Sequence, residues 1–480
     1  MISSSRHQRN LSESRGIKSL RTSLLIVIAL FLISPISSTS SFAAERSKKN
    51  VVAKKPAPKK QAKQVRAPVK RVRAPVKRAS KPPVIRRASV PVQPLTQENP
   101  AALRGRMRTF SEPSSPPPLS TVSVAYDGRV AFSEQVPSMR SRFSGRIAAK
   151  TDRDELVFYS FDPQLQDYVE SLVRRSPDNH LAIVAMEPMT GRVLAMAGQS
   201  VSLSNPIFHN GYPAASLFKV VTATAAIEHA SVTPNHLVRF RGGDYVLERF
   251  NFRADPRRDN RTMTIGEAMG RSANPVFGRL ALEALSPRIL SATARDFGFN
   301  DDLQADIPVP ISHAYIPSDD YELARTGAGF GEVTISPIHA ASMVSGVANG
   351  GNLLRPIFID KVLSPTGALH YRSRPTIVSR MASEHATESL FEMMENTTSI
   401  GTGRRAFSEQ GRPVFPDIRI AAKTGTLNGK NPAGLTRWFI AVAPRERPRI
   451  AIAVVAVHPG RPRGNPSVYG RQILGRYFGG

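Results

Sequence analysis

The 480-residue sequence contains no cysteine. Disulfides, thiol nucleophiles and thiolate metal sites are therefore excluded. The histidines do not have the spacing of metal ligands, so we expect neither a metal nor another cofactor. Hydrophobic residues make up 41% of the chain, which is enough to build a core.

Long hydrophobic runs are also missing from the beginning of the chain. The apolar run at 24–33 is much shorter than the roughly 20 residues that a membrane helix needs. Basic residues precede this run, and small residues follow it at 41–44. This order predicts a signal peptide over 1–43 and export to the periplasm or cell envelope. The alternative is an uncleaved membrane anchor formed by 24–33.

Acidic residues are absent from 46–97, where many Lys and Arg residues alternate with Ala, Pro and Val. Such a stretch cannot bury a core, and its proline content favours an extended chain. We therefore predict a disordered basic arm over 44–119, which carries much of the net charge of +29. The arm is either a simple tether or a segment that binds anionic wall polymers or lipid headgroups. Nucleic acid is not expected as a partner of an exported protein.

Lysine is scarce after Lys81, because arginine supplies nearly all of the later positive charge. Burial or a neighbouring cation can deprotonate a lysine, whereas arginine stays protonated. One of the few remaining lysines, Lys219, follows Ser216 by three positions, which places both side chains on one face of a helix. Ser216 is therefore a candidate nucleophile, and Lys219 is its candidate general base.

Two more motifs follow in order along the chain. Ser272-Ala273-Asn274 lies at an expected helix break, because Pro275 comes next. Lys423-Thr424-Gly425-Thr426 follows an apolar strand that we expect at 418–422. Each motif is weak alone, but their order and spacing match the active-site set of serine acyl-transfer proteins.

Apolar periodicity predicts an α+β fold. Expected strands lie at 181–186, 193–196, 418–422, 438–443 and 450–457. Expected helices lie at 164–174, 217–230, 264–285, 334–349 and 468–477. Two early and three late strands imply one antiparallel five-stranded sheet flanked by helices, with a mostly helical insertion. We expect a small bridge segment at 120–154 and the folded domain at 155–480.

The region 155–480 resembles the transpeptidase domain of penicillin-binding proteins, in the superfamily of serine β-lactamases and DD-peptidases. The three motifs carry the resemblance, together with segments 161–166, 185–197, 329–351 and 401–406. The resemblance implies that the protein cross-links peptidoglycan stem peptides through an acyl-enzyme on Ser216. It also implies that β-lactams bind at the same site.

The resemblance further implies roles for the other motif residues. Ser272 would relay a proton to the leaving amine, and Asn274 would bind the substrate amide. The backbone N–H groups of Ser216 and Thr426 would form the oxyanion hole. The strand motif would bind the terminal carboxylate through Lys423, Thr424, Gly425 and Thr426.

Two features depart from related enzymes. The middle motif has Ala273 where Asp also occurs, and the Glu-x-x-Leu-Asn segment that some β-lactamases use for deacylation is absent. Both favour slow release of an acyl-enzyme to water. The alternatives are a DD-carboxypeptidase or β-lactamase of the same fold, or a non-catalytic protein that binds the wall or senses β-lactams.

Overall fold

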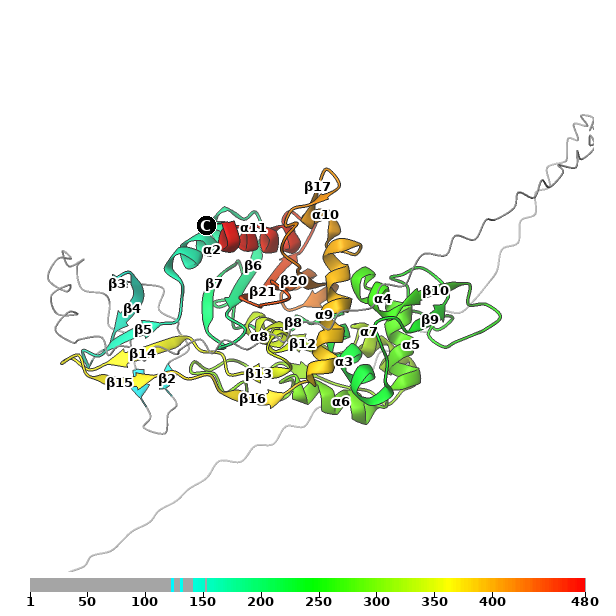
Figure 1. Ribbon diagram of the computed structural model, residues 1–480, viewed down its shortest axis with the longest axis horizontal. Helices are drawn as coiled ribbons and strands as arrows, with labels where there is room; N and C mark the ends of the chain where they lie inside the picture. The colour runs from blue at the N-terminus through cyan, green and yellow to red at the C-terminus, as the bar shows by residue number, and fades with distance from the viewer. Residues whose placement is uncertain (1–121, 125–129, 133–140, 152, 480) are drawn as a thin grey trace, which may run out of the picture. The chain divides into compact units, whose positions relative to one another are not determined.

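The computed structural model describes residues 122–124, 130–132, 141–151 and 153–479 (Figure 1). The predicted signal peptide 1–43 and basic arm 44–119 lie outside the described residues. Within the described part, none of the helices combines the length and apolar character that a membrane span requires.

A five-stranded antiparallel sheet forms the centre of the domain, with strand order β19-β20-β21-β6-β7. Its strands are β6 (His180–Met186), β7 (Val193–Ser200), β19 (Ala421–Lys430), β20 (Ala433–Ala443) and β21 (Ile450–His458). The prediction of one sheet built from two early and three late strands is therefore confirmed.

The prediction for the first late strand was wrong in its position. We expected a strand at 418–422 that ends before the Lys-Thr-Gly motif, whereas β19 begins at Ala421 and contains the whole motif. The strand is held by continuous pairing with β20, from Ala421 opposite Val442 to Lys430 opposite Ala433. The sequence of β19 is mostly polar, so a search for apolar runs does not detect the strand. An edge strand needs little burial once its backbone is paired.

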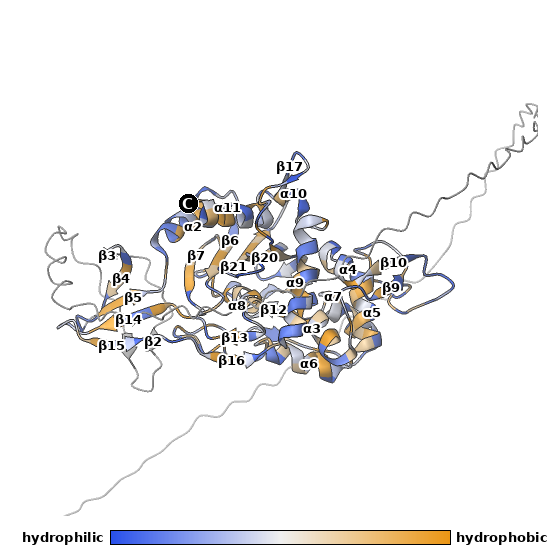
Figure 2. Cartoon of the chain, in the orientation of Figure 1, coloured by the Kyte–Doolittle hydropathy of each residue, from blue (hydrophilic) through white to orange (hydrophobic). Residues whose placement is uncertain are grey.

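Hydrophobic residues cover both faces of the inner strands (Figure 2). Every residue of β21 is buried. One face of the sheet packs on α8 (Pro337–Ala348), and the other packs on α2 (Pro163–Arg175) and α11 (Pro466–Gly479). A strand buried on both faces loses the apolar and polar alternation, which explains the unbroken apolar sequence at 450–457.

The segment between β7 and β19 is mostly helical, as predicted. Besides α8, its helices are η2 (Ala215–Phe218), α3 (Lys219–Ala230), α4 (Ile265–Arg271), α5 (Asn274–Ala284), α6 (Pro287–Asp296), α7 (Asp320–Ala328), α9 (Glu384–Ser399) and α10 (Arg404–Phe407). The expected break in 264–285 occurs at Ser272, where α4 ends in the left-handed conformation with φ of 58°. The helix expected at 334–349 begins later, because Val333–Ile335 form strand β12.

A second five-stranded sheet was not predicted. It has the order β15-β14-β5-β4-β3, with strands β3 (Ser141–Phe143), β4 (Arg146–Lys150), β5 (Leu156–Tyr159), β14 (Ile359–Leu363) and β15 (Leu369–Arg372). The boundary that we drew between 154 and 155 falls inside this sheet, between β4 and β5. The sequence signal is weak because the strands are short and come from distant parts of the chain.

The remaining strands are short and form small pairings. They are β1 (Val122–Val124), β2 (Val130–Phe132), β8 (Tyr212–Pro213), β9 (Leu237–Phe240), β10 (Arg261–Thr264), β11 (His313–Ala314), β12, β13 (Asn352–Leu354), β16 (Ile377–Arg380), β17 (Ser408–Glu409) and β18 (Arg412–Pro413). Among them, β8 ends two residues before Ala215 and pairs with β12.

Two glycines of α11 provide a matched test of how tightly this helix packs on the sheet. A Cβ at Gly470 would lie 2.4 Å from two ring carbons of Phe439, whereas a Cβ at Gly475 would meet only Phe415, at 3.9 Å. We expect Gly470→Ala to lower the free energy of unfolding by about 1–3 kcal/mol. Gly475→Ala should raise it by about 0.5–1 kcal/mol, because alanine favours the helix. Denaturant unfolding measures both, and an equal effect at the two positions would contradict this packing.

Candidate active site

Ser216 lies in η2, and this short helix ends directly before Lys219, the first residue of α3. The preceding residue, Ala215, has φ of 50°, so the chain turns sharply before the serine. Two glycines make room for this turn. A Cβ at Gly329 would lie 2.4 Å from the carbonyl oxygen of Ala215, and one at Gly425 would lie 3.3 Å from the Cβ of Ala215. The end of α7 and strand β19 can therefore both approach the serine.

The amine of Lys219 is completely buried and contacts three groups. Its Nζ lies 2.8 Å from Ser216 Oγ, 2.8 Å from Asn274 Oδ1 and 2.6 Å from the carbonyl oxygen of Ala328. Burial lowers the pKa of Lys219 well below its ordinary value, and the positive charge of Lys423 lowers it further. A neutral amine is therefore favoured at this position.

The contacts of the neutral amine orient its lone pair. Asn274 Nδ2 donates to the carbonyl oxygen of Tyr245 at 2.8 Å, so the amide oxygen of Asn274 must face Lys219. A neutral amine has two N–H groups, and the Asn274 and Ala328 oxygens can only accept. Both N–H groups are then used, and the lone pair is left to accept the hydroxyl proton of Ser216. This is the geometry that a general base requires.

A second buried lysine lies beside the first. Lys423 Nζ donates to Ser272 Oγ at 3.0 Å and to the carbonyl oxygen of Thr424 at 2.8 Å. Burial lowers the pKa of Lys423 to about 7. The left-handed turn at Ser272 directs its hydroxyl toward this amine. Asn274 is the first residue of α5, and its side chain contacts Lys219. The break between α4 and α5 thus serves both lysines.

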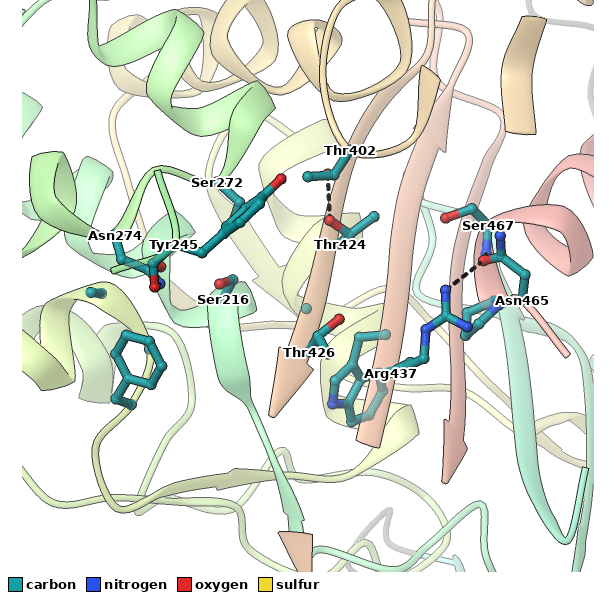
Figure 3. A pocket seen from close by; sticks show the side chains of 16 residues that line it. Ser216, Tyr245, Ser272, Asn274, Thr402, Thr424, Thr426, Arg437, Asn465 and Ser467 are labelled. Atoms are coloured by element: carbon teal, nitrogen blue, oxygen red, sulfur yellow. Dashed lines mark hydrogen bonds between the residues drawn. The ribbon is translucent and has the colours of Figure 1, made fainter. Parts of the chain in front are cut away.

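These groups border a cleft of about 420 Å3 (Figure 3). Six of the predicted site residues line it: Ser216, Ser272, Asn274, Thr424, Gly425 and Thr426. The two lysines lie beneath the surface of the cleft. Lys219 contacts Ser216 and Lys423 contacts Ser272, and both serines line the cleft. Strand β19 forms one border of the cleft, which continues past Thr426 toward Arg437 and the beginning of α11 (Figure 3).

Sequence reasoning missed several residues of the cleft. Tyr245, Thr402 and Arg437 line it, and so do Phe330, Trp438, Asn465 and Ser467. Thr402 Oγ1 and Thr424 Oγ1 are hydrogen-bonded at 2.5 Å. Thr402 belongs to segment 401–406, which carries part of the family resemblance but for which the sequence implies no role. Trp438 is 2% exposed, and its indole N–H donates to the carbonyl oxygen of Pro213 at 2.8 Å.

Comparison with known families gives one clear match. The model of the penicillin-binding protein transpeptidase domain matches residues 181–474, which contain all three motifs. The chain belongs to this family.

A curated relative is the peptidoglycan D,D-transpeptidase PbpA of Mycobacterium tuberculosis (strain CDC 1551 / Oshkosh). It is 26% identical over 316 residues, covering 57% of this chain and 61% of the relative. The chain therefore spans less than two thirds of that protein.

Solved structures share the fold. A D,D-transpeptidase domain of a peptidoglycan glycosyltransferase from Eggerthella lenta aligns with a TM-score of 0.56 at 22% identity, covering 71% of this chain and 85% of that one. A penicillin G acyl-enzyme complex of penicillin-binding protein A from M. tuberculosis aligns with a TM-score of 0.54 at 24% identity, covering 67% of this chain and 80% of that one.

The burial of Lys423 predicts a pH-dependent stability. The amine has a pKa of about 7 in the folded protein and about 10.4 in an unfolded chain. Between these values the unfolded chain binds the proton and the folded protein does not, so this lysine makes stability rise with pH. The free energy of unfolding of the wild type, minus that of Lys423→Met, should increase by at most about 1.4 kcal/mol per pH unit over this interval. Urea unfolding at several pH values measures it, and a constant difference would contradict the buried, neutral amine.

Proposed function

We propose that this protein is an extracytoplasmic serine DD-transpeptidase that cross-links peptidoglycan stem peptides through an acyl-enzyme on Ser216. The observation that carries the proposal is the buried amine of Lys219, 2.8 Å from Ser216 Oγ, with its other contacts made to acceptors. Family membership and the likeness to PbpA support the same function. Penicillin would acylate the same serine. Penicillin-binding protein A of M. tuberculosis, which shares the fold, forms an acyl-enzyme complex with penicillin G.

The first half of the reaction transfers the acyl group to the enzyme. Ser216 Oγ attacks the carbonyl carbon of the penultimate D-alanine while its proton passes to Lys219 Nζ. The negative charge that develops on the carbonyl oxygen is held by the backbone N–H groups of Ser216 and Thr426, and each such donor contributes roughly 3–4 kcal/mol to the transition state. The C–N bond to the terminal D-alanine then breaks, and its nitrogen takes a proton through Ser272.

Substrate binding uses the strand motif and the middle motif. The terminal carboxylate is bound by the hydroxyls of Thr424 and Thr426. The Lys423 amine lies beneath these hydroxyls and donates a hydrogen bond to Ser272. The side-chain amide of Asn274 contacts the peptide. The donor peptide lies along β19 as an added strand, which is open to pairing because β19 is at the edge of its sheet.

The second half of the reaction releases the acyl group and regenerates the free Ser216 hydroxyl. The amine of a neighbouring stem peptide attacks the acyl carbon, gives its extra proton to Lys219, and Ser216 leaves as a hydroxyl. Attack by water instead would give a carboxypeptidase or, with penicillin, a β-lactamase. Peptidoglycan lies outside the cytoplasm, so the proposal agrees with the export signal predicted at 1–43. The basic arm at 44–119 would then hold the domain near anionic polymers or lipid headgroups.

Single substitutions test the two central residues. Ser216→Ala should form no covalent adduct with penicillin G. Lys219→Met should be acylated about 10²–10⁴-fold more slowly at neutral pH, because it lacks the general base. Lys430→Met, at the exposed end of the same strand as Lys423, serves as the control and should react like the wild type. Intact-protein mass spectrometry measures the adduct, and acylation of Ser216→Ala at the wild-type rate would reject the assignment.

Product analysis separates the transpeptidase from the alternatives. The purified protein is incubated with a stem pentapeptide and an acceptor amine, and the products are identified by mass spectrometry. Cross-linked dimers are expected. Release of D-alanine without dimers would indicate a carboxypeptidase, and rapid loss of bound penicillin would indicate a β-lactamase. A stable penicillin adduct without peptide turnover would indicate a sensor.

A further inference from the structure

The far end of the cleft carries a positive charge that the proposed reaction does not use. Arg437 lies in β20 directly opposite Thr426 of β19. Facing residues of an antiparallel pair have Cβ atoms about 4.5–5.5 Å apart on the same face of the sheet. Figure 3 shows the cleft running from Ser216 past Thr426 to the Arg437 side chain. A ligand attached to Ser216 that follows the cleft along β19 past Thr426 would therefore reach this arginine.

Arg437 is the only charged side chain among the described residues that line the cleft. Its Nη1 donates to the carbonyl oxygen of Gly464 at 3.1 Å and its Nη2 to Asn465 Oδ1 at 3.4 Å. Both acceptors are neutral. The Asp178 carboxylate attracts the guanidinium electrostatically, but within the described part of the chain no carboxylate forms an ion pair with it. A guanidinium has five N–H donors, so donors remain for a ligand. The charge of this side chain is thus available to an anion.

The surroundings hold Arg437 in place. The loop that carries Gly464 and Asn465 is tied to the core, because Asp178 Oδ1 accepts from the N–H of Gly464 at 2.8 Å. A Cβ at Gly464 would lie 1.9 Å from Asp178 Oδ2, so only glycine allows this close approach. Asp178 also accepts from the Tyr469 hydroxyl at 2.9 Å. The two acceptors of Arg437 therefore belong to a fixed loop, and the guanidinium is ordered before a ligand arrives.

The position also favours negative charge on other grounds. Asn465 and Ser467 border the first turn of α11, and the beginning of a helix carries a partial positive charge. Carboxylates are absent from the described residues that line the cleft. A charge-assisted hydrogen bond formed in a partly buried cleft is stronger than one in open water.

We propose that Arg437 binds a second carboxylate of the acyl donor, on the portion that remains attached to Ser216 after acylation. The inference rests on the proposed function and specifies its substrate. The preferred donor would carry one carboxylate at its terminus, bound near Thr424, and another on a side chain that precedes the scissile bond. A donor in which that side chain is neutral or amidated would lose the contact. Arg437 is thus a specificity residue for an anionic stem peptide.

Two penicillins provide a matched probe pair. Carbenicillin differs from penicillin G by one carboxylate on the acylamino side chain, which stays on the serine after acylation. We expect Arg437→Gln to slow acylation by carbenicillin by about 10-fold or more, and acylation by penicillin G by less than about 3-fold. Arg412→Gln removes the same charge from an exposed position outside the cleft and should change neither rate. Second-order rate constants come from intact-protein mass spectrometry.

The outcomes separate this inference from the proposed function. An equal change for both penicillins, or no change for either, would overturn the role of Arg437. Failure of penicillin G to acylate the wild type at Ser216 would overturn the proposed function itself. If circular dichroism shows that Arg437→Gln is unfolded, Arg437→Lys is compared instead. Loss of the planar guanidinium should then slow acylation by carbenicillin several-fold relative to acylation by penicillin G. An unchanged ratio of the two rates overturns the proposal.

Discussion

The cleft is organised by the Lys219 amine, which is buried among neutral acceptors. A carboxylate in place of either acceptor would stabilise the protonated amine and remove the base. The acceptors are instead an amide oxygen and a backbone carbonyl, from Asn274 and Ala328. The orientation of Asn274 depends in turn on the carbonyl of Tyr245. The nucleophile is thus activated where η2, α3, α5 and α7 meet, at the nitrogen atom of Lys219.

Lys219 and Lys423 have no carboxylate partner among the residues that the structure describes. Burying them is therefore unfavourable for stability, and the rest of the domain must offset this cost. The central sheet does so, because β21 is buried throughout and helices pack on both faces. The strand that carries Lys423 is at the edge of this sheet, where one side of its backbone is free to pair with a peptide. The same sheet therefore supplies stability at its centre and binding capacity at its edge.

Much of the domain could be predicted from sequence. The central sheet, the helical insertion and the break at Ser272 all follow from apolar periodicity and from proline. The position of β19 was wrong because its pairing with β20 replaces hydrophobic burial as the source of order. The second sheet was missed because β5 pairs with β14, about 200 residues later, and short strands give weak local patterns. Tyr245 and Arg437 were missed because no motif contains them.

The sequence by itself determined which residue types are available and placed Ser216 and Lys219 one helical turn apart, because that contact is local. Only the tertiary structure decided that Asn274 and Ala328 contact the amine, that the Tyr245 carbonyl orients Asn274, and that Lys423 lies beside Ser272. These contacts join residues 55, 109 and 151 positions apart. Packing of helices against the sheet fixes such distances, whereas spacing along the chain does not. For the same reason, only the fold reveals that Arg437 faces the cleft.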